Sequence, residues 1–359
     1  MFPTLKIRDL EVKLPIIQGG MGIGVSMSKL AAAVANEGGI GIISGAQPGY
    51  QEENFRTDNN AANVQGLIKE IRKARELAPN GAIGVNFLAA SKNYTDLVMA
   101  AVKEKVDLVI SGAGLPKTLP SLVKGTSTKI APIVSSGKAA ATIAKIWDRK
   151  YDYLPDAVIV EGPLAGGHLG FHPDDLKDGN WPNLKDLVTE VVEALKPFEE
   201  KYDRKVAVIA AGGVFSGADM AEMMEAGAAG VQMATRFVTT EECDASDAFK
   251  QAYIDATEDD IEIIVSPVGL PGRAVKNKFT ELAKEGAHKV TRCYLCLKGC
   301  NPATTPYCIT DALVASVEGD TENGLVFVGQ NASKLTEIST VHNVIESIRN
   351  EYETYIESK

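Results

Sequence analysis

The chain of 359 residues contains little positive charge. Lysine and arginine number 37 against 47 acidic residues, which gives a formal net charge of -10 at pH 7. This deficit excludes nucleic acid and anionic membrane surfaces as partners, because neither phosphate neutralisation nor a polybasic anchor is available. The expected partner is therefore a small-molecule substrate.

Long apolar runs are also absent. No segment approaches the roughly 18 apolar residues that a membrane span requires, and charges interrupt residues 1–15, so neither a membrane helix nor a signal peptide is predicted. A globular cytoplasmic protein is expected by elimination. The sequence leaves the oligomeric state open, a homodimer included.

Eight short apolar runs recur along the chain. Nearly all are continuous rather than alternating, which is typical of parallel strands that helices cover on both faces. The expected strands are residues 15–18, 39–44, 82–86, 107–111, 129–134, 156–160, 206–211 and 229–233. Eight such repeats predict an α/β fold, a closed TIM (β/α)8 barrel.

The segments between these runs have helical periodicity. An apolar stripe that would pack on a sheet consists of Leu184, Leu187, Val188, Val191 and Leu195, and further helices are expected at 27–36, 61–77, 94–104, 138–147 and 218–226. An open doubly wound sheet is the alternative, but residues 19–24 lack its G-x-G-x-x-G spacing. The barrel is preferred for residues 1–240, with a smaller helical C-terminal region over 241–359 that returns to it.

One histidine lies in a glycine-rich loop directly after the sixth expected strand. Residues 161–171 read EGPLAGGHLGF and place His168 where that strand would end. Barrel active sites are built from such loops, and an imidazole exchanges protons near neutral pH. His168 is therefore the candidate proton-transfer residue, and the alternative is a histidine that only caps a carbonyl. The other three histidines are interpreted as surface or packing residues.

The loops after the last two expected strands form a candidate phosphate site. Gly212 and Gly213 precede a helix, and Gln232 to Thr235 end the eighth run. Barrel enzymes commonly hold a phosphate between these loops, where backbone N–H groups and a helix dipole favour an anion. A ligand with one phosphate and a flat ring describes flavin mononucleotide (FMN). A phosphate-binding barrel without redox chemistry is the alternative.

Five segments carry a resemblance to a known family. They are PIIQGGMG (15–22), AGGHLG (165–170), VIAAGGV (208–214), ATRF (234–237) and GQNASKL (329–335). The chain resembles the nitronate monooxygenases, once called 2-nitropropane dioxygenases, whose superfamily includes the flavin-dependent enoyl-acyl carrier protein reductase II. The resemblance implies an FMN-binding TIM barrel with a smaller helical part.

The resemblance also implies roles for individual residues. His168 matches the catalytic histidine, which acts as a base toward neutral nitroalkanes. The implied FMN contacts are Gln18, Gly19, Gly20 and Met21 in the first loop, Asn86 after the third strand, Gly166 and Gly167 beside the ring, and Gly212, Gly213, Gln232, Met233, Ala234 and Thr235 around the phosphate. The implied reaction is the oxidation of alkyl nitronates by dioxygen. The alternatives are NAD(P)H-dependent reduction of enoyl thioesters and NADH:quinone reduction, although no dedicated nicotinamide motif is visible.

Four of the five cysteines are crowded into one segment. Cys293, Cys296, Cys300 and Cys308 are spaced Cys-x2-Cys-x3-Cys-x7-Cys. Four thiolates this close can enclose zinc or an iron-sulfur cluster, and the first three spacings resemble the cluster loop of iron-sulfur flavin reductases related to old yellow enzyme. The alternatives are reduced packing residues or a redox-labile pair.

Overall fold

The computed structural model describes residues 2–176, 179 and 181–359. Eight parallel strands close into a barrel. In order around the barrel they are β3 (Ile16–Gln18), β4 (Ile40–Ser44), β5 (Ala82–Leu88), β6 (Leu108–Gly112), β7 (Lys129–Val134), β8 (Ala157–Glu161), β10 (Ala207–Ala211) and β11 (Gly230–Met233). Each expected strand is confirmed, and the open doubly wound alternative is wrong.

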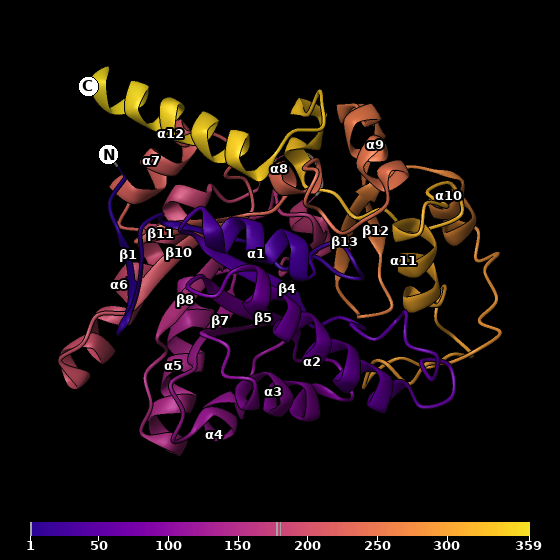
Figure 1. Cartoon of the computed structure of the whole chain (residues 1–359), viewed down its shortest axis with the longest axis horizontal. Helices are drawn as coiled ribbons and strands as arrows, with labels where there is room; N and C mark the ends of the chain where they lie inside the picture. Colours follow the sequence, from indigo (N-terminus) through magenta and orange to yellow (C-terminus); the bar gives the residue numbers. More distant parts are fainter. Residues whose placement is uncertain (1, 177–178, 180) are drawn as a thin grey trace.

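Helices surround the barrel and bury their apolar faces against its outer surface (Figure 1). They are α1 (Ser28–Asn36), α2 (Asn59–Leu77), α3 (Tyr94–Lys103), α4 (Leu119–Val123), α5 (Gly137–Tyr151), α6 (Leu184–Tyr202), α7 (Gly217–Glu225) and the short α8 (Thr235–Val238). The predicted stripe on α6 is buried except at Leu184, which is partly buried. Of these barrel helices, α4 and α8 were not predicted, because four or five residues are too few to establish a helical period.

An N-terminal hairpin packs against the barrel interior. Strands β1 (Leu5–Ile7) and β2 (Leu10–Val12) pair antiparallel, and Leu5, Ile7 and Val12 belong to the same apolar cluster as the inward-facing residues of the barrel strands. Burying these side chains keeps water from the interior at the end of the barrel where the strands begin.

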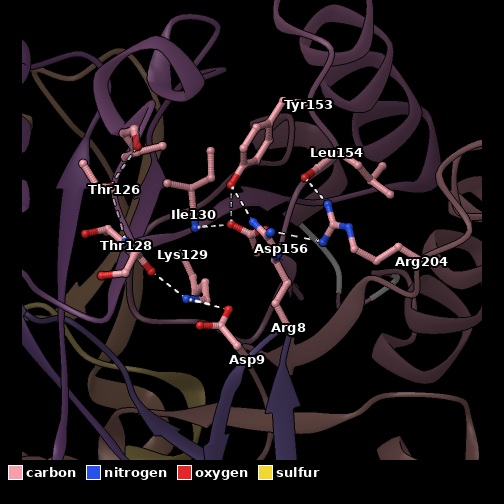
Figure 2. A network of polar contacts seen from close by, with 12 residues as sticks. Arg8, Asp9, Thr126, Thr128, Lys129, Ile130, Tyr153, Leu154, Asp156 and Arg204 are labelled. Carbon is pink, nitrogen blue, oxygen red and sulfur yellow. Dashed lines mark hydrogen bonds and ion pairs between the residues drawn. The ribbon is translucent and has the colours of Figure 1, made fainter.

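A buried carboxylate fastens this hairpin to the barrel (Figure 2). Asp156 is fully buried, and its oxygens lie 3.3 Å from Arg8 of the hairpin and 3.4 Å from Arg204. The same carboxylate accepts hydrogen bonds from the Tyr153 hydroxyl at 2.8 Å and from the backbone N–H of Ile130 at 2.9 Å. Asp156 thus joins the hairpin to the starts of two neighbouring strands.

A helical C-terminal region is expected from the sequence, but the region also contains strands. It contains α9 (Asp247–Asp255), α10 (Lys278–Lys284), α11 (Ile309–Val317), α12 (Val341–Glu357) and the 3₁₀ turns η2 (Glu258–Asp260) and η3 (Gln330–Lys334), but also a hairpin, β12 (Ile261–Val265) and β13 (Pro271–Val275). Strand β13 pairs with β9 (Gly167–His168) of the barrel loops, and this long-range pairing is invisible to local patterns. A further 3₁₀ turn, η1 (Pro173–Leu176), precedes α6.

The end of the chain packs against the barrel helices. Helix α12 packs against α7 and is drawn in yellow along it in Figure 1. Val341, Val344, Ile345 and Ile348 form its buried face. No helix in the described part of the chain has both the length and the apolar character to cross a bilayer.

Candidate functional site

A cavity of about 270 Å³ opens at the carboxyl ends of the barrel strands. Residues from all eight strands or from the loops that follow them line it, which is the usual position of a TIM-barrel active site. It contains most of the predicted site residues, namely Gly19, Gly20, Met21, Asn86, Gly166, Gly167, His168, Gly212, Gly213, Gln232, Ala234 and Thr235. The structure therefore gathers loops that lie far apart in the sequence.

Two predicted contacts, Gln18 and Met233, do not line this cavity. Gln18 is fully buried, its Oε1 accepts a hydrogen bond from the backbone N–H of Ile42 at 3.0 Å, and its Nε2 donates to the Gly19 carbonyl. Met233 is buried in the apolar layer outside the strands. Both residues end strands, where successive side chains point to opposite faces, so a position beside the cavity does not ensure contact with it.

Two buried amide oxygens in the cavity wall lack a hydrogen-bond partner. They are Oδ1 of Asn86 and Oε1 of Gln232. Since a buried polar atom without a partner costs free energy, such atoms in a cavity indicate a ligand that carries complementary donors. Neutral amides of this kind suit the polar edge of a flavin ring or its ribityl hydroxyls.

Glycines shape the other end of the cavity. Gly212 and Gly213 have φ angles of 76° and 136°, in the left-handed region that side-chain-bearing residues avoid. Asn331, in the GQNASKL segment, donates from Nδ2 to the Gly213 carbonyl at 2.9 Å and also lines the cavity. A side chain at Gly329 would place its Cβ 2.6 Å from Thr235 Oγ1, so three loops meet tightly here.

This meeting of loops fits a phosphate. The backbone N–H groups of the glycines and the Thr235 hydroxyl are neutral hydrogen-bond donors, which suit an anion. These are the two loops in which the sequence predicts a phosphate. The residues present therefore fit a flavin with a phosphate tail. Its ring would lie toward Asn86 and Gly166, and its phosphate toward Gly213 and Thr235.

His168 is held at the cavity by strand pairing. It lies in β9, opposite Gly272 of β13, and its ring meets the edge of the Phe327 ring at a centroid distance of 5.0 Å. Its Nε2 atom lies 2.7 Å from Ser266 Oγ. Burial lowers the pKa of His168 from 6.5 to about 4, so the imidazole is neutral at pH 7.

A carboxylic acid shares the cavity with this histidine. Glu161 ends β8, and burial raises its pKa from 4.5 to about 7. Its protonated and ionised forms are therefore both populated at neutral pH, unlike those of a solvated glutamate. A group of this kind in a cavity is a functional candidate.

Arg273 holds the backbone of the histidine loop. Its guanidinium is almost completely buried and donates to the carbonyls of Pro163 at 2.7 Å and Ala165 at 2.5 Å. Burial lowers its pKa to about 10, and it lies over the Trp181 ring. Arg273 therefore stabilises the backbone of the loop and does not line the cavity.

The four clustered cysteines are free thiols in the structure. Cys296 lines the cavity, and burial raises the pKa of its thiol. Among the described residues, no group of three or more His, Cys, Asp or Glu side chains has the arrangement to hold a metal ion. The zinc and iron-sulfur interpretations of Cys293, Cys296, Cys300 and Cys308 thus gain no support from the geometry.

Several cavity residues were not among the predicted contacts. Glu161 and Asn331 lie in segments that the sequence had singled out, so their signal was present. Ser266 does not line the cavity but contacts His168, and no local signal marks it, because the two residues meet only through the folding of the C-terminal region. The expectation that the other histidines are surface or packing residues agrees with their places: His172 and His342 are exposed, and His288 packs on Phe279.

A parallel barrel whose strand ends carry this cavity defines an oxidoreductase of the TIM-barrel class that works with a flavin. The family model of nitronate monooxygenase matches residues 4–351. The chain belongs to the nitronate monooxygenase family.

Individual curated relatives share about a quarter of their residues with this chain. The chain is 26% identical to "(3aS,4S,5R,7aS)-5-hydroxy-7a-methyl-1-oxo-octahydro-1H-indene-4-carboxyl-CoA dehydrogenase" of Mycobacterium tuberculosis (strain ATCC 25618 / H37Rv), over 94% of this chain and 93% of that protein. It is 27% identical to "Probable nitronate monooxygenase" of Staphylococcus aureus (strain Newman), over 76% and 78%.

Solved structures agree on the architecture. FabK from Thermotoga maritima superposes with a TM-score of 0.75 at 30% identity, covering 97% of this chain and 95% of FabK. Nitroalkane oxidase from Streptomyces ansochromogenes superposes with a TM-score of 0.74 at 22% identity, covering 97% and 98%, which shows a shared fold.

Proposed function

We propose that the protein binds FMN and oxidises alkyl nitronates and neutral nitroalkanes with dioxygen. The observation that carries the proposal is the neutral imidazole of His168 in a cavity whose other wall has unpaired amide oxygens and a glycine cradle. FMN bound there would supply the redox chemistry, taking electrons from the substrate and passing them to dioxygen.

Asn86 and Gln232 are the residues proposed to hold the flavin ring and ribityl chain. Gly212, Gly213, Ala234 and Thr235 are proposed to hold the phosphate. The apolar lining from Ile23, Phe327 and Leu313 would exclude water from the substrate.

His168 is proposed to remove the acidic proton next to the nitro group of a neutral nitroalkane. Burial keeps the lone pair of His168 free at pH 7, which action as a base requires. Preformed nitronates would need no base.

Reduction or oxidation of an acyl thioester is the second candidate. It is favoured by the relative from Mycobacterium tuberculosis, whose name specifies a CoA thioester as the molecule dehydrogenated, and by the 30% identity to FabK. Dehydrogenation would again use His168 as a base toward a C–H bond. Enoyl reduction or quinone reduction would require NADH.

Two measurements test the proposal. The cofactor released by heat from the purified protein is identified by chromatography and is expected to be FMN. The protein is then mixed without air with ethylnitronate, with NADH and with an acyl-CoA in separate experiments, while flavin absorbance is followed. Rapid bleaching by ethylnitronate alone supports the proposal, and rapid bleaching by NADH but not by ethylnitronate overturns it.

A further inference from the structure

A buried glutamine lines the cavity in the loop of residues 45–58, between β4 and α2. Gln47 is 8% exposed, and its backbone has a φ angle of 50°, in the left-handed region that few side-chain-bearing residues adopt. Such a conformation persists only where the surrounding structure holds it, and residues of this kind concentrate at ligand sites. The loop therefore keeps Gln47 at the cavity wall against its backbone preference.

Two asparagines of α2 bind the oxygen end of the Gln47 side chain. Asn59 Nδ2 donates to Gln47 Oε1 at 2.8 Å, and Asn63 Nδ2 donates to the same oxygen at 2.9 Å. Asn63 Nδ2 also donates to Asn59 Oδ1 at 2.9 Å, so the three amides form one connected network. Asn63 is fully buried, and neither asparagine lines the cavity. The oxygen of Gln47 is therefore satisfied by the protein itself.

A backbone group fixes which end of each amide is the donor. The Gly49 N–H can only donate, and its nitrogen lies 3.0 Å from Asn63 Oδ1, so the other end of the Asn63 amide is the donor Nδ2. The Gln47 atom that faces Asn63 Nδ2 must then be the oxygen. Nε2 of Gln47 is the opposite end of the amide, and it has no hydrogen-bond partner in the described part of the chain. Because the two ends diverge, Nε2 faces away from the asparagines, on the side of the cavity.

The residue before Gln47 belongs to the histidine side of the cavity. Ala46 and Phe327 pack against one apolar cluster that includes Ile23 and Leu313, and all four residues line the cavity. The Phe327 ring in turn meets the edge of the His168 ring. This is the apolar part of the cavity that is proposed to surround the substrate, apart from the glycine cradle proposed for the phosphate.

We propose that Gln47 is a substrate-binding residue whose Nε2–H group donates to the oxygens of the nitro group. When the C–H bond next to that group breaks, its proton passes to the His168 imidazole and its electron pair moves onto the nitro oxygens. A donor that is already fixed in place stabilises this charge as it develops, without reorganising during the reaction. The inference deepens the proposed function, on which its kinetic consequence rests.

Propionate tests the contact without any reaction. Its carboxylate has the shape of the nitro group of nitroethane and the charge of the nitronate. The flavin-loaded protein is titrated with propionate while the flavin absorbance is followed. In ¹⁵N-labelled protein, the side-chain amide signals of Gln47 are assigned from their loss in Gln47→Met. Propionate is expected to bind and to shift a Gln47 Nε2–H signal downfield. No binding, or binding without that shift, overturns the proposal.

Two substitutions separate the donor from the other properties of the amide. Gln47→Glu keeps an oxygen for Asn59 and Asn63 but adds a charge, whereas Gln47→Met adds no charge but loses that oxygen. Both lack the Nε2–H group, so both are expected to weaken propionate binding and to lower kcat/KM for nitroethane about tenfold to hundredfold, as for a hydrogen bond to a charged group. A loss in Gln47→Glu alone would indicate charge repulsion, and a loss in Gln47→Met alone would indicate an unanchored loop. Either result, or no loss in both variants, overturns the proposal.

Gln51 is the matched control in the same loop. It is exposed, does not line the cavity, and donates from Nε2 to the Tyr50 hydroxyl at 3.0 Å. Gln51→Glu adds the same charge and is expected to leave the propionate affinity and the nitroethane rate unchanged. Equal losses in Gln51→Glu and Gln47→Glu contradict a direct contact. If the Gln47 signal responds to propionate as expected but nitroethane is not turned over, the binding role of Gln47 stands and the proposed substrate fails.

Discussion

The Nε2 atom of His168 lies 2.7 Å from Ser266 Oγ, although the two residues are 98 positions apart in the chain. The histidine follows a barrel strand, whereas the serine lies in the turn between β12 and β13. The barrel alone therefore does not complete the site. The C-terminal hairpin supplies both the strand that pairs with β9 and the hydroxyl that contacts the imidazole.

Replacing His168 by asparagine is predicted to separate two substrates. Turnover of neutral nitroethane should fall by about two to four orders of magnitude, which is the usual contribution of a general base. Turnover of preformed ethylnitronate should persist, since its proton has already left, and FMN should remain bound. Steady-state oxygen consumption with each substrate measures the effect. Equal losses with both substrates would show that His168 does not act as the base.

The pH dependence of the nitroethane reaction is predicted to have an unusually low acid limb. Burial lowers the pKa of His168 from 6.5 to about 4, so its lone pair is lost only as the pH falls through about 4. Between pH 7 and pH 5, kcat/KM for nitroethane should thus stay nearly constant. An acid limb centred near 6.5 that persists in Glu161→Gln would place His168 in a solvated environment and contradict the structure.

Much of the barrel is predictable from sequence because its signals are local. A continuous apolar run such as residues 206–211 identifies a doubly covered strand by itself, and Gly212 marks the loop that follows. The order of loops around a TIM barrel then brings the strand ends together. That is why most of the predicted cavity residues lie where they were expected.

The remainder depends on side-chain direction and on long-range pairing. Gln18 sits one residue before the cavity loop, yet its side chain accepts a hydrogen bond from the Ile42 backbone and does not line the cavity. Ser266 has no local motif at all, because its contact with His168 exists only once β13 pairs with β9. Neither fact can be read from a single strand or loop.

Gln18 and Gln232 offer a direct comparison of a structural and a ligand-binding amide. Gln18→Leu leaves the Ile42 N–H without an acceptor, so the free energy of unfolding should fall by about 1–3 kcal/mol while FMN affinity is retained. Gln232→Leu removes an oxygen that has no protein partner, so FMN affinity should fall about fivefold to hundredfold with stability retained or raised. Urea unfolding of the apoprotein and fluorescence titration with FMN measure the two quantities. The opposite assignment of effects would restore Gln18 as the flavin contact.

Glu161 is predicted to give the bound flavin a pH-dependent spectrum. Burial raises its pKa to about 7, so its charge in the cavity wall changes across neutral pH. The flavin absorbance should shift with a midpoint near pH 7 in the wild type and should not shift in Glu161→Gln. A midpoint that survives in the variant would assign the titration to another group.

Asp156 is predicted to be the polar group on which the attachment of the N-terminal hairpin depends most. It is fully buried and accepts hydrogen bonds from Arg8, Tyr153 and the Ile130 N–H, so Asp156→Ala leaves several partners unpaired. Removing one member of a buried ion pair costs about 3–5 kcal/mol, and urea unfolding should show a loss of that order. Asp9→Ala is the control. Its carboxylate forms an ion pair of 2.9 Å with Lys129 but is 75% exposed, so about 0–1 kcal/mol is expected.

Both variants leave the far end of the barrel intact, since neither aspartate lines the cavity. FMN titration should therefore give the wild-type affinity in Asp9→Ala and in the folded fraction of Asp156→Ala. If Asp156→Ala loses less than about 1 kcal/mol, apolar packing of Leu5, Ile7 and Val12 holds the hairpin without the carboxylate. The comparison separates the two contributions because the apolar side chains are the same in both variants.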